Sequence, residues 1–143
     1  MGIVMISGEC GAGGLFGKIF PEVGTAAVGN DAVIRAADCA VIIGKNGAAQ
    51  VESALGVIVS GDDPPENIPS DIQLITCGSG AKNTVSFTSS TDTELTLSLN
   101  RSMNTAAGIC DPMELPVPKT AGCDEYDHMA AFAAAVLLGI VPI

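Results

Sequence analysis

The glycine-rich segment GECGAGGLFGKIF, residues 8 to 20, contains residue types that could bind a phosphate group. A Walker-type loop needs a glycine, four further residues, and then Gly-Lys followed by a hydroxyl residue. Its backbone amides surround the phosphates, the lysine reaches the outer ones, and the hydroxyl holds magnesium. Gly17 and Lys18 fit this pattern, but Ala12 stands at the first glycine and Ile19 at the hydroxyl position. Isoleucine cannot ligate magnesium, so the Walker pattern is incomplete.

The same segment also contains a loose dinucleotide turn. Gly11, Gly13 and Gly17 form GxGxxxG, but the acidic residue that should end the second strand is missing, and Asp31 is the nearest carboxylate. Three interpretations stay open: a plain bend between a strand and a helix, a small-anion site at the helix N-terminus, and a true NAD or ATP site.

Lysines follow three of the predicted strands. Parallel strands end at one edge of a sheet, so the loops GLFGK, GKNG and GSGAK should lie together, each with a lysine beside glycines. Two aspartates after the fourth strand would join them and could hold a ribose or a cation. The alternative is that the glycines serve turns and the lysines solubilise loops. The predicted ligand-binding residues are Gly11, Gly13, Lys18, Lys45, Asp62, Asp63 and Lys82.

Two further groups of residues could do chemistry. Cys10 precedes a helix N-terminus, which could lower the pKa of its thiol, but no histidine is near in sequence, so a buried, inert thiol is the favoured interpretation. His128, the one histidine, lies near Cys123, Asp124 and Asp127, a grouping that resembles a metal site. There is no second histidine and the aspartates are explained as helix caps, so we predict no metal and no catalytic residue.

Composition narrows the class of protein. The chain has 143 residues, 48% of them hydrophobic and 15% charged, as expected for one well-packed domain. A net charge of -10 and the absence of tryptophan argue against nucleic-acid binding. Five cysteines without a CxxC pair indicate reduced thiols and a cytoplasmic location. The apolar segment 129–143 is shorter than the roughly 17 to 25 residues that span a bilayer, so no membrane contact is expected.

The hydrophobic pattern predicts an α/β fold with a Rossmann-like, mostly parallel sheet. Short helices would flank the sheet, with a helix N-cap at Asn30 or Asp31 for the second of them. The predicted parallel strands are 3–7, 25–28, 39–43, 57–60 and 72–77, and the predicted helices between them are 15–21, 31–37 and 48–55.

In the second half of the chain the hydrophobic residues recur with a different period. Strict alternation over 84–99 predicts an antiparallel hairpin that extends the sheet. A third strand in GICDPMELPVP should lie at an edge, because its prolines cannot donate to a ladder. An alanine-rich helix over 124–138 should end the chain, clasped between layers or shared with a subunit. We predict one domain over 1–143, made of a parallel part (1–78), antiparallel strands (83–118) and this helix (124–140).

The segments LGVIVSGDDP (55–64) and IQLITCGSGAKNTVSF (72–87) resemble the end of the central domain of the Mur ligases, the ATP-dependent amide-bond enzymes of peptidoglycan synthesis. The resemblance covers about residues 55–110. It places Asp62, Asp63 and Pro64 at the turn that lies close to the adenosine in that family, and Thr76 and Gly78 in the later Thr-Tyr-Gly-like segment.

The resemblance also has departures. Ser60 stands where the family has its adenine-contacting asparagine, the loop at 8–19 lacks the paired threonines, and the stretch with the metal-binding glutamate and histidine has no counterpart. It therefore implies a reduced, Firmicutes-type relative without the ligase machinery.

Together these observations predict non-catalytic binding of a small anionic or nucleotide-like ligand at the carboxyl edge of the sheet, with a nucleotide as the candidate cofactor. Two other classes stay open. One is an interaction module that forms a homodimer through the C-terminal helix. The other is an NAD(P)-binding protein of the Rossmann type.

Overall fold

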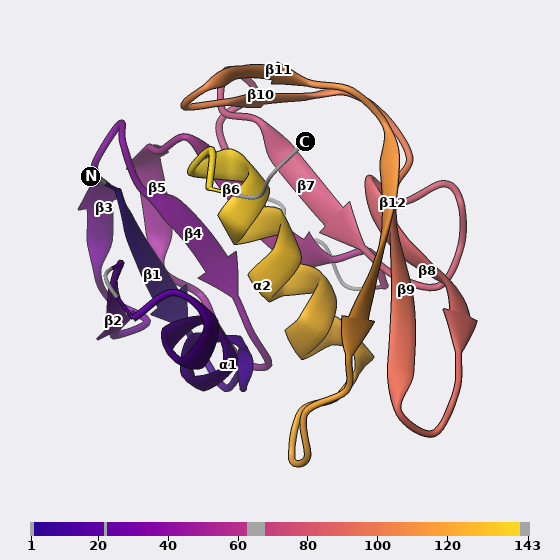
Figure 1. The fold of residues 1–143 in the computed structure, drawn as a ribbon. Coiled ribbons are helices and arrows are strands. Elements are labelled where there is room, and N and C mark those ends of the chain that lie inside the picture. The colour runs from indigo at the N-terminus through magenta and orange to yellow at the C-terminus, as the bar shows by residue number, and fades with distance from the viewer. Residues whose placement is uncertain (1, 22, 63–67, 141–143) are drawn as a thin grey trace.

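The fold is built on one eight-stranded sheet (Figure 1). The structure is a computed structural model that describes residues 2–21, 23–62 and 68–140. In spatial order the strands are β12 (Met113–Pro118), β9 (Glu94–Leu99), β8 (Val85–Ser90), β7 (Leu74–Cys77), β6 (Gly56–Ser60), β4 (Ala40–Ile43), β1 (Ile3–Ser7) and β2 (Gly24–Val28). The sheet therefore joins the first and second halves of the chain.

Six neighbouring strands of this sheet, from β2 to β8, are parallel, and β9 and β12 are antiparallel. All five predicted parallel strands are confirmed. β4 and β6 read AVII and GVIVS and are buried almost throughout, as expected for strands that are covered on both faces. The prediction of a mostly parallel sheet is therefore confirmed.

The two faces of the sheet are covered differently. One face packs against α1 (Ala12–Ile19) and α2 (Glu125–Leu137), and the other packs against a two-stranded parallel ribbon of β3 (Val33–Arg35) and β5 (Gln50–Ser53). The predicted helices over 31–37 and 48–55 are therefore wrong.

Both segments have the period of a strand. Ile34 is buried between two exposed neighbours, and Val51 is buried between exposed Gln50 and Glu52. This period of two places one apolar side chain of each strand on the sheet. An exposed ion pair between Arg35 and Glu52 joins the two strands on the outside. Because the ribbon is only one layer of short strands, it covers the sheet with fewer residues than two helices would need.

The C-terminal helix is confirmed and lies inside the molecule. Its residues 127–137 are all buried, and the helix packs on the central strands β4, β6, β7 and β8, with α1 beside it (Figure 1). Asp124 is the N-cap, and its side chain forms a capping box with Asp127. Among the described residues, no helix is long and apolar enough to cross a membrane.

The antiparallel part is confirmed as well. β8 and β9 form the predicted hairpin, and β12 lies at the edge with two prolines inside the strand. A second hairpin, β10 (Met103–Thr105) with β11 (Gly108–Cys110), was not predicted. It forms a separate two-stranded sheet beyond the end of α2 (Figure 1).

Replacing Leu137 with alanine should lower the free energy of unfolding by about 2–5 kcal/mol, because this side chain at the end of α2 is completely buried in the larger core. Urea denaturation measures the change. Ile109→Ala is the control: that side chain is 69% exposed, so the change should stay below about 0.5 kcal/mol. Equal effects of both substitutions would contradict this packing of α2.

Candidate functional site

A polar pocket of about 520 Å³ lies at the carboxyl ends of the central strands. We call it the carboxyl-edge pocket. Residues from the ends of β4 and β6, from the loops after β1 and β4, and from the first turn of α2 line it: Glu9, Ile43, Gly44, Lys45, Asn46, Gly47, Val59, Ser60, Asp124, Tyr126 and Asp127.

The topology of the sheet explains why a pocket forms here. β1 lies between β2 and β4, and the chain leaves β1 through α1 on one face but reaches β4 through β3 on the other. The connections on the two sides of β1 therefore diverge to opposite faces. Such a switch point opens a crevice beyond the carboxyl ends of the strands, which is where open α/β sheets bind ligands.

The floor of this crevice is closed by backbone pairing. Glu9 and Lys45 exchange two hydrogen bonds between the loops after β1 and β4, with N···O distances of 2.8 and 2.9 Å. The loops approach so closely that a side chain at Gly8, Gly44 or Gly47 would meet backbone atoms of the opposite loop within 2.6 Å. These glycines therefore serve loop packing, and the amide of Gly44 already donates to the carbonyl of Ser7.

The side chains of Ser7 and Asn30 form hydrogen bonds that hold the same loops in place. The buried hydroxyl of Ser7 accepts hydrogen bonds from the amides of Ala48 and Ala49 and donates to Asn30. The side-chain amide of Asn30 donates in turn to the carbonyl of Asn46. The ends of β1, β2 and β4 are therefore held in one arrangement.

Asp127 holds the N-termini of both helices together. Its carboxylate accepts hydrogen bonds from the backbone amide of Gly11 at the start of α1 (2.9 Å), from the thiol of Cys10 (3.3 Å) and from the amide of Asp124 at the start of α2 (3.1 Å). The side chain is 7% exposed. A helix N-terminus attracts an anion, and here the chain supplies its own.

The charged side chains of the lining make the pocket acidic. Three carboxylates line it, those of Glu9, Asp124 and Asp127, against one ammonium group, that of Lys45. The hydroxyl of Tyr126 donates to the carbonyl of Ile43 at 2.7 Å, and burial raises the pKa of this tyrosine, so it stays neutral. The pocket therefore offers negative charge and carbonyl oxygens to a ligand.

Of the predicted ligand-binding residues that the structure describes, one lines the carboxyl-edge pocket. Among the seven, Lys45 lines the carboxyl-edge pocket and Gly11 adjoins it through Asp127. Gly13 packs against Ile6, where a side chain would come within 2.5 Å, and Lys18 lies in the last turn of α1, at the end away from Gly11. Asp62 and Lys82 are exposed in the loops after β6 and β7, and Asp63 lies outside the described residues.

The sequence analysis missed Glu9 and Tyr126. A signal for Tyr126 was present, since it is the one tyrosine of the chain and lies in the first turn of the last helix. Hydrogen bonds join segment 82–84 (KNT) to segment 99–102 (LNRS). The side chain of Asn100 donates to the carbonyl of Asn83, and the guanidinium group of Arg101 donates to the carbonyl of Lys82.

Cys10 and His128 are both held in inactive forms. Burial, followed by the influence of Asp127, raises the pKa of the Cys10 thiol to about 12, so it is protonated at neutral pH. His128 is buried, and both of its ring nitrogens are occupied: Nδ1 donates to the carbonyl of Asp124 (2.7 Å) and Nε2 accepts from the amide of Thr120 (3.1 Å). Among the described residues, no group of His, Cys, Asp and Glu side chains could hold a metal ion.

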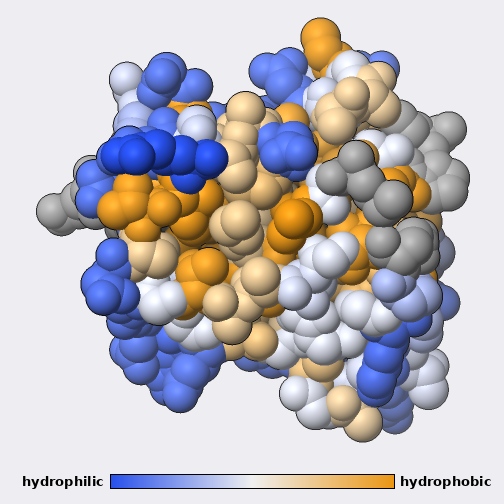
Figure 2. All heavy atoms as spheres, turned by 90° about the vertical axis from the view of Figure 1, so that its left-hand side faces the viewer, coloured by the Kyte–Doolittle hydropathy of each residue, from blue (hydrophilic) through white to orange (hydrophobic). Residues whose placement is uncertain are grey.

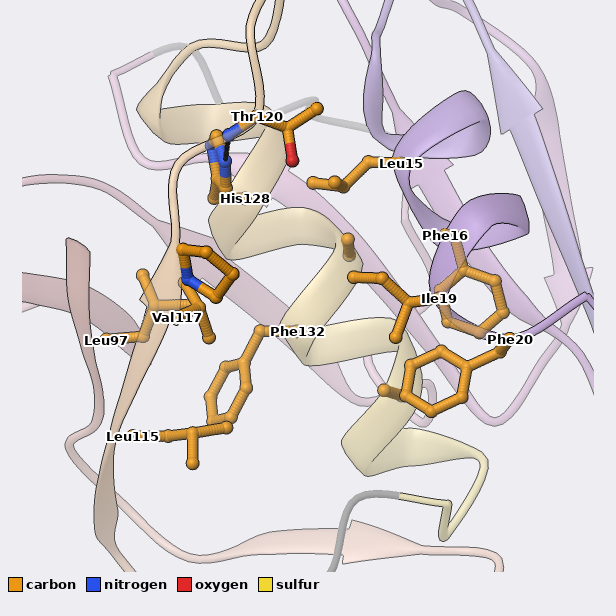
Figure 3. Close-up of a pocket in the computed structure, with 13 residues that line it drawn as sticks. Leu15, Phe16, Ile19, Phe20, Leu97, Leu115, Val117, Thr120, His128 and Phe132 are labelled. Carbon is orange, nitrogen blue, oxygen red and sulfur yellow. Dashed lines mark hydrogen bonds between the residues drawn. The ribbon is translucent and has the colours of Figure 1, made fainter. Parts of the chain in front are cut away.

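A second hollow, the apolar groove, lies on the outer side of α2 and has a volume of about 310 Å³. Leu15 and Ile19 of α1 face Leu115 and Val117 of β12 across it, with Phe132 of α2 between them (Figure 3). It also contains Phe16, Phe20, Leu97, Pro118, Thr120, His128, Ala131 and Ala135, and no charged side chain lines it. The predicted homodimer through the C-terminal helix stays a prediction.

No family model matches the chain, and neither a curated protein nor a solved structure gives a significant match. The resemblance to the Mur ligases therefore stays a prediction. What the site can do must be argued from its own geometry.

Replacing Asp127 with asparagine should lower the free energy of unfolding by about 2–4 kcal/mol, because the carboxylate serves three donors and an amide NH₂ group would face one of them. Chemical denaturation at neutral pH measures the loss. Glu125→Gln is the matched control, as an exposed carboxylate in the same helix turn, and should change stability by less than about 0.5 kcal/mol. A loss no larger than that of the control would show that Asp127 does not join the helices.

The raised pKa of Cys10 predicts a pH dependence of stability. In the unfolded chain the thiol loses its proton near its ordinary pKa of 9.0, whereas in the folded chain it keeps the proton to about pH 12. The contribution of Cys10 to the free energy of unfolding is therefore fully present below pH 9, and it is lost as the pH rises from 9 to 12. Urea denaturation at several pH values should show a smaller fall for Cys10→Ala than for the wild type. Identical falls would mean that the thiol is not buried as described.

Proposed function

We propose that this protein is a non-catalytic binding protein for a small polar molecule, which it holds in the carboxyl-edge pocket. The observation that carries the proposal is the position of this pocket at the switch point between β1 and β4. Its volume of about 520 Å³ lies within the range of roughly 300–1,000 Å³ that is usual for small-molecule sites.

The charge of the lining supports a ligand with a positively charged group. The pocket carries three carboxylates and one ammonium group, and the anion position at the start of α1 is filled by Asp127. An ammonium or guanidinium group would pair with Glu9, which is exposed and forms no side-chain hydrogen bond with the described residues. Lys45 lies on the adjoining loop and could meet a carboxylate. An amino acid or another zwitterionic amine matches this pattern better than the small anionic or nucleotide-like ligand expected from the sequence.

The state of Cys10 and His128 supports binding without chemistry. The thiol of Cys10, which donates to Asp127 of the lining, is protonated at neutral pH, and the ring nitrogens of His128 are both hydrogen-bonded. The strand order β2-β1-β4-β6-β7, with crossovers on opposite faces, supports the Rossmann-like interpretation of the parallel part. A nucleotide or Mur-ligase-like ligand would need its phosphates elsewhere than at α1.

Thermal-shift and calorimetric titrations with lysine, 1,4-diaminobutane and inorganic phosphate test the proposal. The amines should raise the melting temperature in a concentration-dependent way, and phosphate should not. Glu9→Gln should weaken amine binding about threefold to tenfold, because it removes the charged partner. Lys45→Ala should not weaken the binding of the diamine, which has no carboxylate for Lys45 to meet and is repelled by its ammonium group.

Glu114→Gln is the matched control, since Glu114 is an exposed glutamate on β12, outside the lining of the pocket. It should bind the amines like the wild type. A melting shift with phosphate that Lys45→Ala abolishes would restore the anionic ligand and refute the amine. No shift with any of the three probes would count against the pocket as a binding site.

A further inference from the structure

The edge strand β2 has an unprotected outer side. Its sequence GTAAV contains no charged residue and no proline, and it pairs with β1 alone among the described residues. Gly24, Thr25, Ala26 and Ala27 are exposed, so the described residues leave most of the strand open to solvent. The outer side of such a strand presents unpaired N–H and C=O groups, which another strand can satisfy.

The opposite edge of the sheet is protected. β12 contains Pro116 and Pro118, which have no N–H to donate, and its side chain of Glu114 is exposed. Prolines and charges are the usual means by which proteins prevent pairing at an edge. Only one of the two edges of this sheet is therefore open to a further strand, and any assembly through β2 stops at two copies.

The surface around β2 suits a second copy of the same chain. The chain has a net charge of -10, so two copies repel each other over most of their surfaces. On the side of the molecule where β1, β2 and β3 lie, a band of apolar and weakly apolar residues crosses the middle, with hydrophilic residues towards the margins (Figure 2). Ile3 and Val33 on this side are 43% and 48% exposed. Two copies can meet at this band without bringing like charges together.

The helix beside β2 adds a second observation. Gly14 and Gly17 lie on the side of α1 turned away from the buried residues Ala12, Leu15 and Phe16, and a side chain at either glycine would meet no atom of the described residues within 4 Å. Glycine inside a helix destabilises it by roughly 0.5–1 kcal/mol relative to alanine. Packing within one copy does not explain these two glycines, whereas the close approach of a second α1 would.

We propose that two copies of this chain pair through β2 in an antiparallel, two-fold symmetric dimer, which makes one continuous sheet of sixteen strands from two sheets of eight. The two-fold axis passes beside Ala26, so that Ala26 lies opposite Ala26 of the second copy and Gly24 lies opposite its Val28. The strand has five residues, so the interface is small and the dimer dissociates on dilution. The proposal does not depend on the ligand of the carboxyl-edge pocket.

Sedimentation velocity of the full chain over a concentration series tests the dimer, and hydrogen exchange of the amides in 24–28 locates it. Ala26→Lys and Ala26→Glu should each raise the dissociation constant at least about tenfold, or about 1.4 kcal/mol, because like charges then lie directly opposite each other. A mixture of the two variants should restore the dimer, since opposite charges then meet. Ala26 is exposed, so both variants should keep the fold, as circular dichroism will show.

Ala121→Lys is the matched control, since it adds the same charge at an exposed alanine in the turn before α2. It should dimerise like the wild type. A wild-type chain that is monomeric at every concentration, with no slowing of exchange in 24–28, would overturn the proposal. So would Ala26 variants that dimerise as well as the wild type, or a control that loses the dimer to the same extent.

Discussion

The carboxylate of Asp127 accepts hydrogen bonds from the first residues of both helices, and the arrangement of the molecule depends on this contact. α1 and α2 lie on the same face of the sheet, and both begin at the carboxyl ends of the parallel strands. Their positive ends therefore meet, which is unfavourable unless a negative group lies between them. Asp127 provides this group from within α2 and also completes the capping box of that helix. One side chain thus fixes the position of α2 relative to α1.

This contact also determines which ligand the carboxyl edge can accept. In many α/β proteins the amides at the first helix N-terminus hold a phosphate. Here the amide of Gly11 donates to Asp127, and the amides of Gly44 and Lys45 donate to the carbonyls of Ser7 and Glu9. The glycines of these loops permit this close backbone approach. The free charges that remain at the pocket are mostly negative, which favours an amine.

Periodicity and strand composition predicted the elements that have strong patterns. The apolar runs of β4 and β6 and the alternation in β8 and β9 each indicated the correct element, and the prolines of β12 also indicated its position at the edge of the sheet. β3 and β5 are three and four residues long, and each has one buried residue, Ile34 and Val51. A single buried residue does not define a period, so the sequence could not distinguish a strand from a helix there. For the site, sequence could not show that Asp127 reaches Gly11, because 116 residues separate them. The sequence analysis therefore predicted that Gly11 and Gly13 bind a ligand.

An NMR titration with inorganic phosphate tests most directly whether Asp127 takes the place of an external anion. The amide signals of Gly11 and Ala12 are followed in the wild type and in Asp127→Ala. We expect no saturable shift of these signals in the wild type, and a saturable shift in the variant, in which the amide of Gly11 has lost its internal acceptor. Saturable phosphate binding at Gly11 in the wild type would contradict the account.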